Sequence, residues 1–528
     1  MRYVKLLRKR QKMAVKIGKI TGPPGCGKTT EIMRLIDAAC KKYDPSELGV
    51  VSFTNASVEE VKNRIFKRYE KQQRKALDNV RTMHSHCYRI LEMAKTAVAE
   101  THQKEFNEEY PHLAFSNGRI KNDNDYTWNA YREKNNAALF NHMQILRNKL
   151  IPQSEWNPAV QEMHESWLSW MQKHSLTDFT GMLEKTLESK MGPMISILFV
   201  DESQDLTPLQ HELIKNWSIR TDNTTYAGDS DQCIFRFSGA MPENFIQLDA
   251  GWNKHLGVSY RNSPAVYKYA REIAKGIEDR EDTDYEPSKS YGEGQVINAM
   301  TPDLSLEGTH MIICRCEYQL KKWIHFLLRQ KQIWHNPYRI EDKSWNPQMT
   351  KTWRAVQIYQ RLSQGQMIGL KDLKIMTDNL KAQSNLVRGA KKEIMALEQE
   401  PDEKRTVDIF GLSSIGFTDE FIGGKQSVRE MFRITGQSST LLEHMLDSNI
   451  DINKKPRVII GTIHSIKGGE ADHVWIDTGI TNLIYQEIKS NDRAKFDEAR
   501  VAYVAATRAR KTVGLLRSRL WNPMLPRI

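Results

Sequence analysis

Short apolar runs, bounded by polar or turn-forming residues, recur along the chain and alternate with stretches of helical periodicity. In the first part of the chain they are KIGKI (residues 16–20), GVVSFT (49–54), ISILFV (195–200) and TTYAGD (224–229). Later runs are GVSY (257–260), VINAM (296–300), MIICRC (311–316), RVIIG (457–461), HVWID (473–477) and TVGLL (512–516). Runs of this length, joined by helices, are typical of parallel strands buried on both faces. The pattern predicts an α/β fold with parallel sheets flanked by helices.

Two stretches of a different character interrupt this alternation. Residues 91–190 are polar and rich in Trp, His and Asn, and residues 341–455 are charged, and both have mainly helical periodicity. A chain of 528 residues is also too long for one hydrophobic core. We therefore expect two α/β cores, each interrupted by a mainly helical insert. The expected boundaries are 1–90 with 191–255 for the first core, 91–190 for its insert, 256–340 with 456–528 for the second core, and 341–455 for a reduced second insert.

Charge and composition indicate the kind of partner and the cellular compartment to expect. The formal net charge of +12 favours a polyanionic partner, because Lys and Arg that neutralise phosphates release counterions, although a basic balance also occurs on ordinary soluble surfaces. No apolar run approaches the ~20 residues of a membrane span, and the basic N-terminal segment lacks the apolar region of a secretory signal. Six scattered cysteines suit a reducing compartment. We expect a cytoplasmic protein, prokaryotic or in the cytoplasm of a virus-infected host and associated with the nucleoid, that does not contact membranes.

The segment GPPGCGKT, from Gly22 to Thr29, matches the phosphate-binding P-loop pattern between a predicted strand and a predicted helix. Its glycines allow backbone N–H groups to wrap phosphates, and the helix that follows directs the positive end of its dipole at them. We expect Lys28 to reach the β- and γ-phosphates and the Thr29 hydroxyl to bind Mg²⁺. The segment predicts a nucleoside triphosphate site, and by itself no more.

A pair of acids, Asp201 and Glu202, follows the apolar run ISILFV. In a P-loop core this position lies at the carboxyl edge of the sheet and faces the phosphates. We expect Asp201 to hold Mg²⁺, Glu202 to activate the attacking water, and Gln204 to sense the γ-phosphate. In isolation such a pair would more often be a solvated turn, but here it follows a P-loop.

Seven segments with distinctive residues occur in order along both cores. They are SFTNASVEE (52–60), TMHS (82–85), DESQD (201–205), GDSDQCIFRFSGA (228–240), VSYRNS (258–263), GTIHSIKGGE (461–470) and YVAATRAR (503–510). These segments resemble motifs of the UvrD/Rep/PcrA family of superfamily 1 helicases. The resemblance implies two RecA-like P-loop cores that hydrolyse ATP with Mg²⁺ between them. Any one segment could arise by chance, but the ordered set indicates the family.

The resemblance also implies roles for single residues. Arg261 and Arg508 would act as arginine fingers on the γ-phosphoryl group, and Gln232 would be a second γ-phosphate sensor. Tyr260 would stack on adenine and Glu470 would contact the ribose. Outside these motifs, Tyr260 would be read as a core aromatic and Arg508 as a solvated helix residue. The full set of expected ATP-binding residues is Gln11, Gly22, Pro23, Gly25, Cys26, Gly27, Lys28, Thr29, Thr30, Gln204, Gln232, Tyr260, Arg261, Gly468, Glu470 and Arg508.

Nucleic-acid contacts are expected from the same motifs. Aromatic residues on which bases stack tolerate any sequence, at ~1–3 kcal/mol per base. In the family such aromatics, and residues that contact the phosphate backbone, occur at positions that match Phe53, Thr54, Asn55, His84, Phe235, Phe237 and His464. A Phe beside a strand is more often part of the core, so this set is open to both readings.

Four features depart from the family pattern. Ser238 replaces an arginine in the segment that couples ATP to DNA, and Arg236 could compensate for it. Gly469 replaces a leucine, and the asparagine that precedes the tyrosine is absent before Tyr260. Gln11 lies closer to the P-loop than the adenine-reading glutamine of the family.

The leading interpretation is an ATP-dependent translocase and helicase on DNA, and the resemblance implies 3′-to-5′ polarity. Its expected partners are single-stranded DNA and single/double-strand junctions, and we expect a monomer. One alternative is an RNA-directed motor, and another is a translocase that does not unwind on its own. A small-molecule kinase or NTP-dependent switch is disfavoured, because such proteins do not need the second-core motifs.

Overall fold

The computed structural model describes residues 16–52, 55–68, 78–115, 136–281, 284–339, 345–381, 385–397, 406–424, 426–433, 437–447 and 452–528. The chain forms two compact units. The large unit comprises Met1–Asp303, Cys314–Glu317 and Lys467–Ile528, and the small unit comprises Leu304–Ile313 and Tyr318–Ile466. Among the described residues, none of the helices has the length and apolar character needed to cross a membrane.

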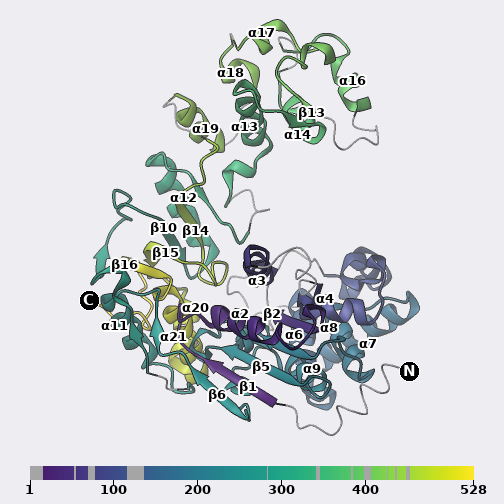
Figure 1. Ribbon diagram of the computed structural model, residues 1–528, viewed down its shortest axis with the longest axis vertical. Coiled ribbons are helices and arrows are strands. Elements are labelled where there is room, and N and C mark those ends of the chain that lie inside the picture. Colours follow the sequence, from purple (N-terminus) through teal and green to yellow (C-terminus); the bar gives the residue numbers. More distant parts are fainter. Residues whose placement is uncertain are drawn as a thin grey trace. The chain divides into compact units, whose positions relative to one another are not determined.

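The first sheet lies in the large unit and has six parallel strands (Figure 1). Its order is β3-β2-β4-β5-β1-β6. The strands are β1 (Lys16–Thr21), β2 (Leu48–Ser52), β3 (Val80–Thr82), β4 (Ile197–Val200), β5 (Asn223–Gly228) and β6 (Trp252–His255). In-register parallel pairing joins each neighbour to the next, as in Ile197 with Asn223 and Val50 with Val80. The predicted α/β class, with parallel sheets flanked by helices, is confirmed.

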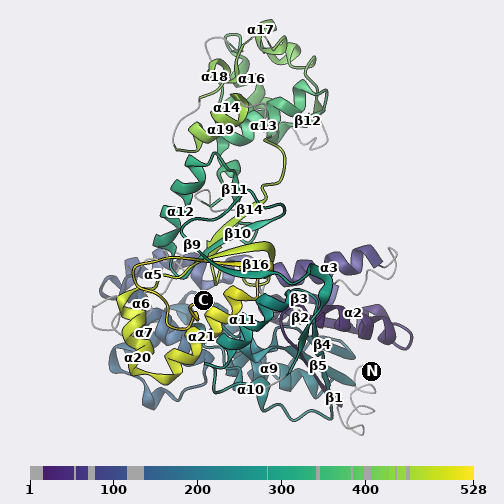
Figure 2. The ribbon, with the colours of Figure 1, turned by 90° about the vertical axis from the view of Figure 1, so that its left-hand side faces the viewer.

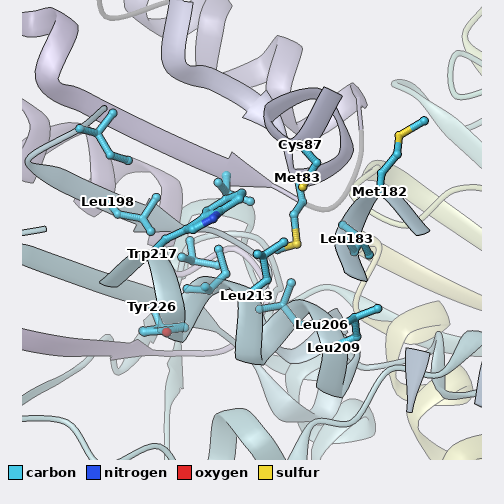
Figure 3. Packing of buried hydrophobic residues seen from close by; sticks show 14 of the residues in the cluster. Met83, Cys87, Met182, Leu183, Leu198, Leu206, Leu209, Leu213, Trp217 and Tyr226 are labelled. Atoms are coloured by element: carbon cyan, nitrogen blue, oxygen red, sulfur yellow. The ribbon is translucent and has the colours of Figure 1, made fainter. Parts of the chain in front are cut away.

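Both faces of this sheet are buried at β2 and β4, which explains why these two strands are largely apolar without alternation. In β4, Leu198 and Val200 enter one core cluster, whereas Ile197 and Phe199 enter the other. The first cluster is covered by α4 (Met83–Ile90), α8 (Phe179–Glu188) and α9 (Pro208–Ser218), and Figure 3 shows its close packing. The second is covered by α2 (Lys28–Ala39) and α3 (Asn55–Arg68). A strand that alternates between two apolar layers must be apolar at every position.

The segment between β3 and β4 is helical in its described part. Besides α4 and α8 it contains α5 (Gln103–Glu109), α6 (Asn136–Asn148) and α7 (Pro158–Lys173). These helices have their own core, in which the rings of Phe106, Trp167 and Trp170 pack against one another. The buried Arg147 lies between Asp178 and Glu184, so the charges buried among these helices are paired.

The large unit also holds a second group of parallel strands, in the order β15-β16-β9. They are β9 (Gln295–Ala299), β15 (Ala471–Asp477) and β16 (Ala509–Leu516). Helices α11 (Pro264–Ala274) and α21 (Asp492–Ala506) pack beside β16, and α20 (Asn482–Ser490) packs on α21 (Figure 2). The last turns of α21 are buried on all sides, from Glu498 to Ala506.

The small unit holds strands in the order β11-β14-β10 and a set of helices drawn mainly in green in Figure 1. The strands are β10 (His310–Cys314), β11 (Trp334–His335) and β14 (Val458–Thr462). In the described part of this unit, the helices of more than one turn are α12 (Glu317–Arg329), α13 (Lys351–Ser363), α14 (Leu370–Asp378), α16 (Ala390–Leu397) and α19 (Gln437–Asp447). A short antiparallel pair, β12 (Ile368–Gly369) with β13 (Thr406–Val407), lies among them.

Candidate functional site

The P-loop connects β1 to α2, as its sequence predicts. Gly25 and Gly27 have φ angles of +74° and +86°, which side-chain-bearing residues rarely adopt. A Cβ atom on Gly25 would lie 2.4 Å from Cβ of Arg261, so this glycine also permits the close approach of a segment more than two hundred residues away. The loop is therefore shaped both for phosphate binding and for contact with the later part of the chain.

Lys28 is buried at the start of α2. Its Nζ donates hydrogen bonds to the carbonyl oxygens of Gly22 at 2.7 Å and Pro23 at 3.1 Å. Burial favours the neutral amine, but the nearby Cys26 and the carboxylates of Asp229, Glu202 and Asp201 outweigh it, so the pKa of Lys28 is raised. The ammonium group thus remains charged in the place where a triphosphate would need a cation.

The two acids at the end of β4 lie beside the P-loop. The Thr29 hydroxyl donates to Asp201 Oδ2 at 3.3 Å, so both predicted magnesium ligands lie together. Burial and the neighbouring Glu202 raise the pKa of Asp201 to about 7. Burial also disfavours the Glu202 carboxylate, but Lys467 and Lys28 outweigh it and lower its pKa. Hydroxyl and carboxylate oxygens are the donors that Mg²⁺ prefers, so the pair fits this ion.

Glu202 itself has a φ angle of +55°. A non-glycine residue in this left-handed region costs about 1–3 kcal/mol unless the surroundings hold it there, and such residues cluster at functional sites. Here Gln204 Nε2 donates to Glu202 Oε2 at 2.5 Å, and Gln204 Oε1 accepts from the backbone N–H of Asp229 at 3.0 Å. Gln204 is fully buried behind Glu202 and orients it.

Residues from the later motifs complete the cleft. Arg508 is 1% exposed, and its Nη2 donates to Gln232 Oε1 at 2.8 Å. Gln232 Nε2 in turn donates to Asp229 Oδ2 at 2.7 Å. Arg261 pairs with Glu470 at 2.6 Å, while the Tyr260 side chain is 60% exposed and its backbone N–H donates to Gly25. Segments distant in sequence thus meet around one site.

The cleft has a volume of about 550 Å³ and is lined by most of the predicted ATP-binding residues. The predicted ATP-binding, metal-binding and catalytic residues that line it are Gly25, Cys26, Gly27, Lys28, Thr29, Thr30, Asp201, Glu202, Gln232, Tyr260, Arg261, Gly468, Glu470 and Arg508. Gly22 and Pro23 contribute through their carbonyl oxygens, which accept the hydrogen bonds of Lys28 Nζ. Gly468 has a φ angle of +91°, in the left-handed region that favours glycine. Gln11 lies outside the described residues.

Three side chains that line this cleft were not predicted from the sequence, namely Glu60, Arg64 and Lys467. Arg64 lines the cleft and donates to the Thr30 hydroxyl at 3.1 Å, held by Glu60 one helical turn earlier in α3. Lys467 also lines the cleft, and its ammonium pairs with the buried Asp205. The four-residue spacing of Glu60 and Arg64 was a signal for their pairing, but nothing local indicated that they face the P-loop.

The residues predicted to contact nucleic acid are spread over several elements, unlike those of the nucleotide cleft. Phe235 and Phe237 lie with ring centroids 6.1 Å apart, and Lys467 Nζ lies 4.9 Å from the Phe235 centroid. His84 is half-buried in α4, where its ring meets Phe179 edge-on and burial lowers its pKa. His464 is buried and belongs to the small unit. Phe53 and Thr54 lie outside the described residues, and so does the side chain of Asn55.

The segment with the serine substitution shows which of its residues face solvent. Ser238 and Phe237 are exposed, whereas Arg236 is buried and paired with carboxylates. Arg236 therefore does not present its charge to a strand at the surface, so any compensation for Ser238 must act through contacts inside the protein.

Comparison with known proteins supports the motif-based resemblance. Residues 7–252 match the model of the UvrD/REP helicase N-terminal domain. The ATP-dependent DNA helicase Rep of Buchnera aphidicola subsp. Schizaphis graminum is 23% identical over 615 aligned positions, covering 95% of this chain and 91% of the relative. The Rep helicase of Buchnera aphidicola subsp. Acyrthosiphon pisum is 24% identical, with 47% of this chain and 41% of the relative covered.

The ATP-dependent DNA helicase PcrA of Bacillus subtilis is 22% identical, with 52% of this chain and 41% of the relative covered. In these comparisons the chain spans under half of two relatives and most of the third. The predicted likeness to UvrD, Rep and PcrA is confirmed.

Proposed function

We propose that this chain is an ATP-dependent DNA helicase that moves along single-stranded DNA. The observation that carries the proposal is the hydrogen-bonded chain from the buried Arg508 through the buried Gln232 to Asp229, which joins the end of α21 to the carboxylates beside the P-loop. An NTP-binding protein with a single core would not need this contact. The relatives named as DNA helicases support DNA as the track.

Four side chains of the cleft would act in the hydrolysis of ATP to ADP and phosphate. Lys28 would exchange its bonds to Gly22 and Pro23 for phosphate oxygens. Glu202, with its lowered pKa, would accept the proton of the attacking water. Arg261 and Arg508 would stabilise the charge that develops on the γ-phosphoryl oxygens.

The donor set of Thr29 and Asp201 would hold Mg²⁺, which supplies charge neutralisation at the phosphates when it is bound. One carboxylate and one hydroxyl suffice, because this ion is normally completed by waters and phosphate oxygens. Asp201, whose pKa is raised to about 7, would lose its proton when it holds the cation.

Motion would follow from the way the cleft is built. We propose two RecA-like cores with the boundaries expected from the sequence, 1–90 with 191–255 and 256–340 with 456–528, each carrying a helical insert. Closure around ATP would move the motifs of the second core against the first core. Repeated closure and opening would then move the protein along the DNA strand, whose bases would stack on the exposed Phe237 and its neighbour Phe235. The 3′-to-5′ polarity, junction binding and monomeric state rest on family resemblance.

Strand displacement on three matched duplexes, 3′-tailed, 5′-tailed and blunt, tests the proposal. We expect ATP- and Mg²⁺-dependent displacement of the 3′-tailed duplex alone. Lys28→Ala should abolish both displacement and ATPase, whereas Lys41→Ala, at an exposed lysine just after α2, should change neither.

Three other outcomes of these measurements would change or contradict the proposed function. ATPase stimulated by single strands without displacement would indicate a translocase that needs a partner to unwind. Stimulation by RNA homopolymers in preference to DNA would indicate an RNA motor. Absence of any stimulation by nucleic acid would contradict the motor function itself.

A further inference from the structure

The guanidinium of Arg236 is buried inside the protein, although its sequence neighbours Phe237 and Ser238 are exposed. Arg236 is 8% exposed. Its Nη2 donates to Glu243 Oε1 at 2.7 Å, its Nε lies 3.0 Å from Asp497 Oδ1, and its Nη1 lies 3.6 Å from Asp279 Oδ2. Glu243 follows in the same region of the chain, whereas Asp497 belongs to α21. Arg236 is thus a link between two elements that are far apart in sequence.

A second buried arginine strengthens this link from the opposite side. Arg500 of α21 is 0% exposed and donates from Nε to the carbonyl oxygen of Ser230 at 3.1 Å. Its Nη2 donates to the backbone oxygen of Asp279 at 2.9 Å and to its carboxylate at 2.8 Å. The segment from Ser230 to Arg236 is therefore tied to α21 at both of its ends.

The same segment and the same helix both lead to the nucleotide cleft. Gln232 lies between the two ties and accepts from Arg508, which follows α21 by two residues. Phe235 and Phe237 flank Arg236 directly in the chain. One short segment thus carries a contact to the cleft, an ion pair to α21 and the predicted base-stacking pair.

We propose that Arg236 is a positioning residue that couples the nucleotide cleft to the aromatic pair, through the ion pair between its buried guanidinium and the half-buried Asp497. Separating this pair would take one of three neighbouring carboxylates away from a guanidinium that stays buried, which opposes the separation. When ATP binding moves α21 and Arg508, this ion pair makes residues 235–237 move together with the helix. The inference rests on the proposed function. In the segment where Ser238 replaces the arginine of the family, it assigns the coupling role to the buried charge of Arg236.

The charges around Arg236 support a fixed cation at this position. Burial disfavours the charged form of Arg236, but Asp497 and Glu243 outweigh burial and raise its pKa. Burial raises the pKa of Asp497, while Arg236, Arg500 and Arg493 act against it. Loss of the Arg236 charge would therefore weaken the hold on Asp497 without removing any residue of the cleft.

The test compares Arg236→Gln, which removes the charge, with Arg236→Lys, which keeps it. For each variant we would measure ATPase kcat with and without saturating oligodeoxythymidylate, the Kd values for a fluorescent ATP analogue and for the oligonucleotide, and Tm. We expect the DNA stimulation factor of Arg236→Gln to fall about tenfold or more while both Kd values stay within about threefold. Arg236→Lys should restore part of the stimulation.

The matched control is Arg493→Gln. Arg493 is also on α21 and approaches the same Glu243, but at 3.4 Å and with its side chain 58% exposed, so we expect an unchanged stimulation factor. Asp497→Asn removes the α21 partner and should reproduce the loss seen in Arg236→Gln. It also serves as the primary test if Arg236→Gln does not fold.

The outcomes separate this inference from the proposed function. A stimulated wild type with an equally stimulated, folded Arg236→Gln would overturn the coupling role alone. A parallel loss of Tm and of both affinities would overturn it as well, since that is the signature of a structural residue. A wild type that DNA does not stimulate would instead contradict the proposed function.

Discussion

Two adjacent carboxylates at the end of β4 differ in protonation because their neighbours differ. Asp201 is buried against Thr29 and next to the charge of Glu202, so its pKa rises to about 7. Glu202 is half-buried and has Lys467 and Lys28 near it, which outweigh the effect of burial, so its pKa falls. A base needs to be free of its proton, whereas a metal ligand can lose its proton when the cation binds. The environment therefore separates the two roles.

Glu202→Gln should retain ATP binding and lose hydrolysis by about 100-fold or more, the scale of general base catalysis. Single-turnover hydrolysis and titration with a fluorescent ATP analogue would measure the two quantities. Glu212→Gln, at an exposed position on α9, is the control and should leave both unchanged. Normal turnover in Glu202→Gln would refute its role as the base.

His86 should make the protein less stable in mild acid. Burial lowers its pKa from the usual 6.5 to about 4, and its ring packs edge-on against Trp217. Between pH 6.5 and pH 4 the unfolded chain would carry a proton on this residue that the folded protein lacks, so stability falls as the pH falls.

Replacing His86 by Phe should remove up to ~1.4 kcal/mol per pH unit from the slope of unfolding free energy in that window. Urea unfolding at a series of pH values measures the slope. His112→Phe, at a side chain that is 61% exposed, should leave it unchanged, and an unaltered slope in His86→Phe would disprove the prediction.

At the scale of elements, α9 shows how a helix places the acidic motif. Thr207 and Gln210 form a capping box at its start, with Pro208 at the first helical position, immediately after the Asp201–Asp205 segment. Leu209, Leu213 and Trp217 recur every four residues and enter the core shown in Figure 3. The helix is thus fixed at its N-terminus and along one face, which packs against β4 in the first sheet.

Leu213→Ala should reduce the free energy of unfolding by ~2–5 kcal/mol, because Leu213 is fully buried and its truncation leaves a cavity. Lys215→Ala, two residues away and with its side chain 69% exposed, should change it by less than about 0.5 kcal/mol. Denaturant unfolding of both variants provides the measurement. Equal effects would mean that α9 does not pack as described.

At the scale of the whole molecule, the nucleotide cleft lies within one compact unit. Every residue that lines it belongs to Met1–Asp303 or Lys467–Ile528. The helices of residues 347–447 belong to the small unit and have their own buried core, which includes Trp353, Leu373 and Phe421. Nucleotide binding should therefore not depend on those helices.

Replacement of residues 347–451 by a short Gly/Ser linker should leave the Kd for a fluorescent ATP analogue within about threefold of the full chain. Circular dichroism and thermal unfolding would establish that the shortened protein folds. Lys28→Ala in the full chain is the negative control for binding. Loss of binding by a folded, shortened protein would show that the small unit contributes to the site.

Local patterns were enough to predict much of this protein. The continuous apolar runs predicted parallel, doubly covered strands, because residues that alternate between two apolar layers have no polar position. The P-loop and the acidic pair were recognisable because their chemistry needs fixed residue types at short spacing, with glycines where φ is positive. The family likeness followed from the order of such segments.

Only the tertiary structure decided which of the distant residues meet. The contact of Arg508 with Gln232, the place of Lys467 beside Asp205 and Phe235, and the burial of Arg236 against Asp497 all join segments more than two hundred residues apart. No periodicity encodes such contacts, because they depend on how the elements pack and not on the sequence around each residue. The opposite pKa shifts of Asp201 and Glu202 have the same origin, since neighbouring residues of one strand end acquire different charged neighbours only when the chain has folded.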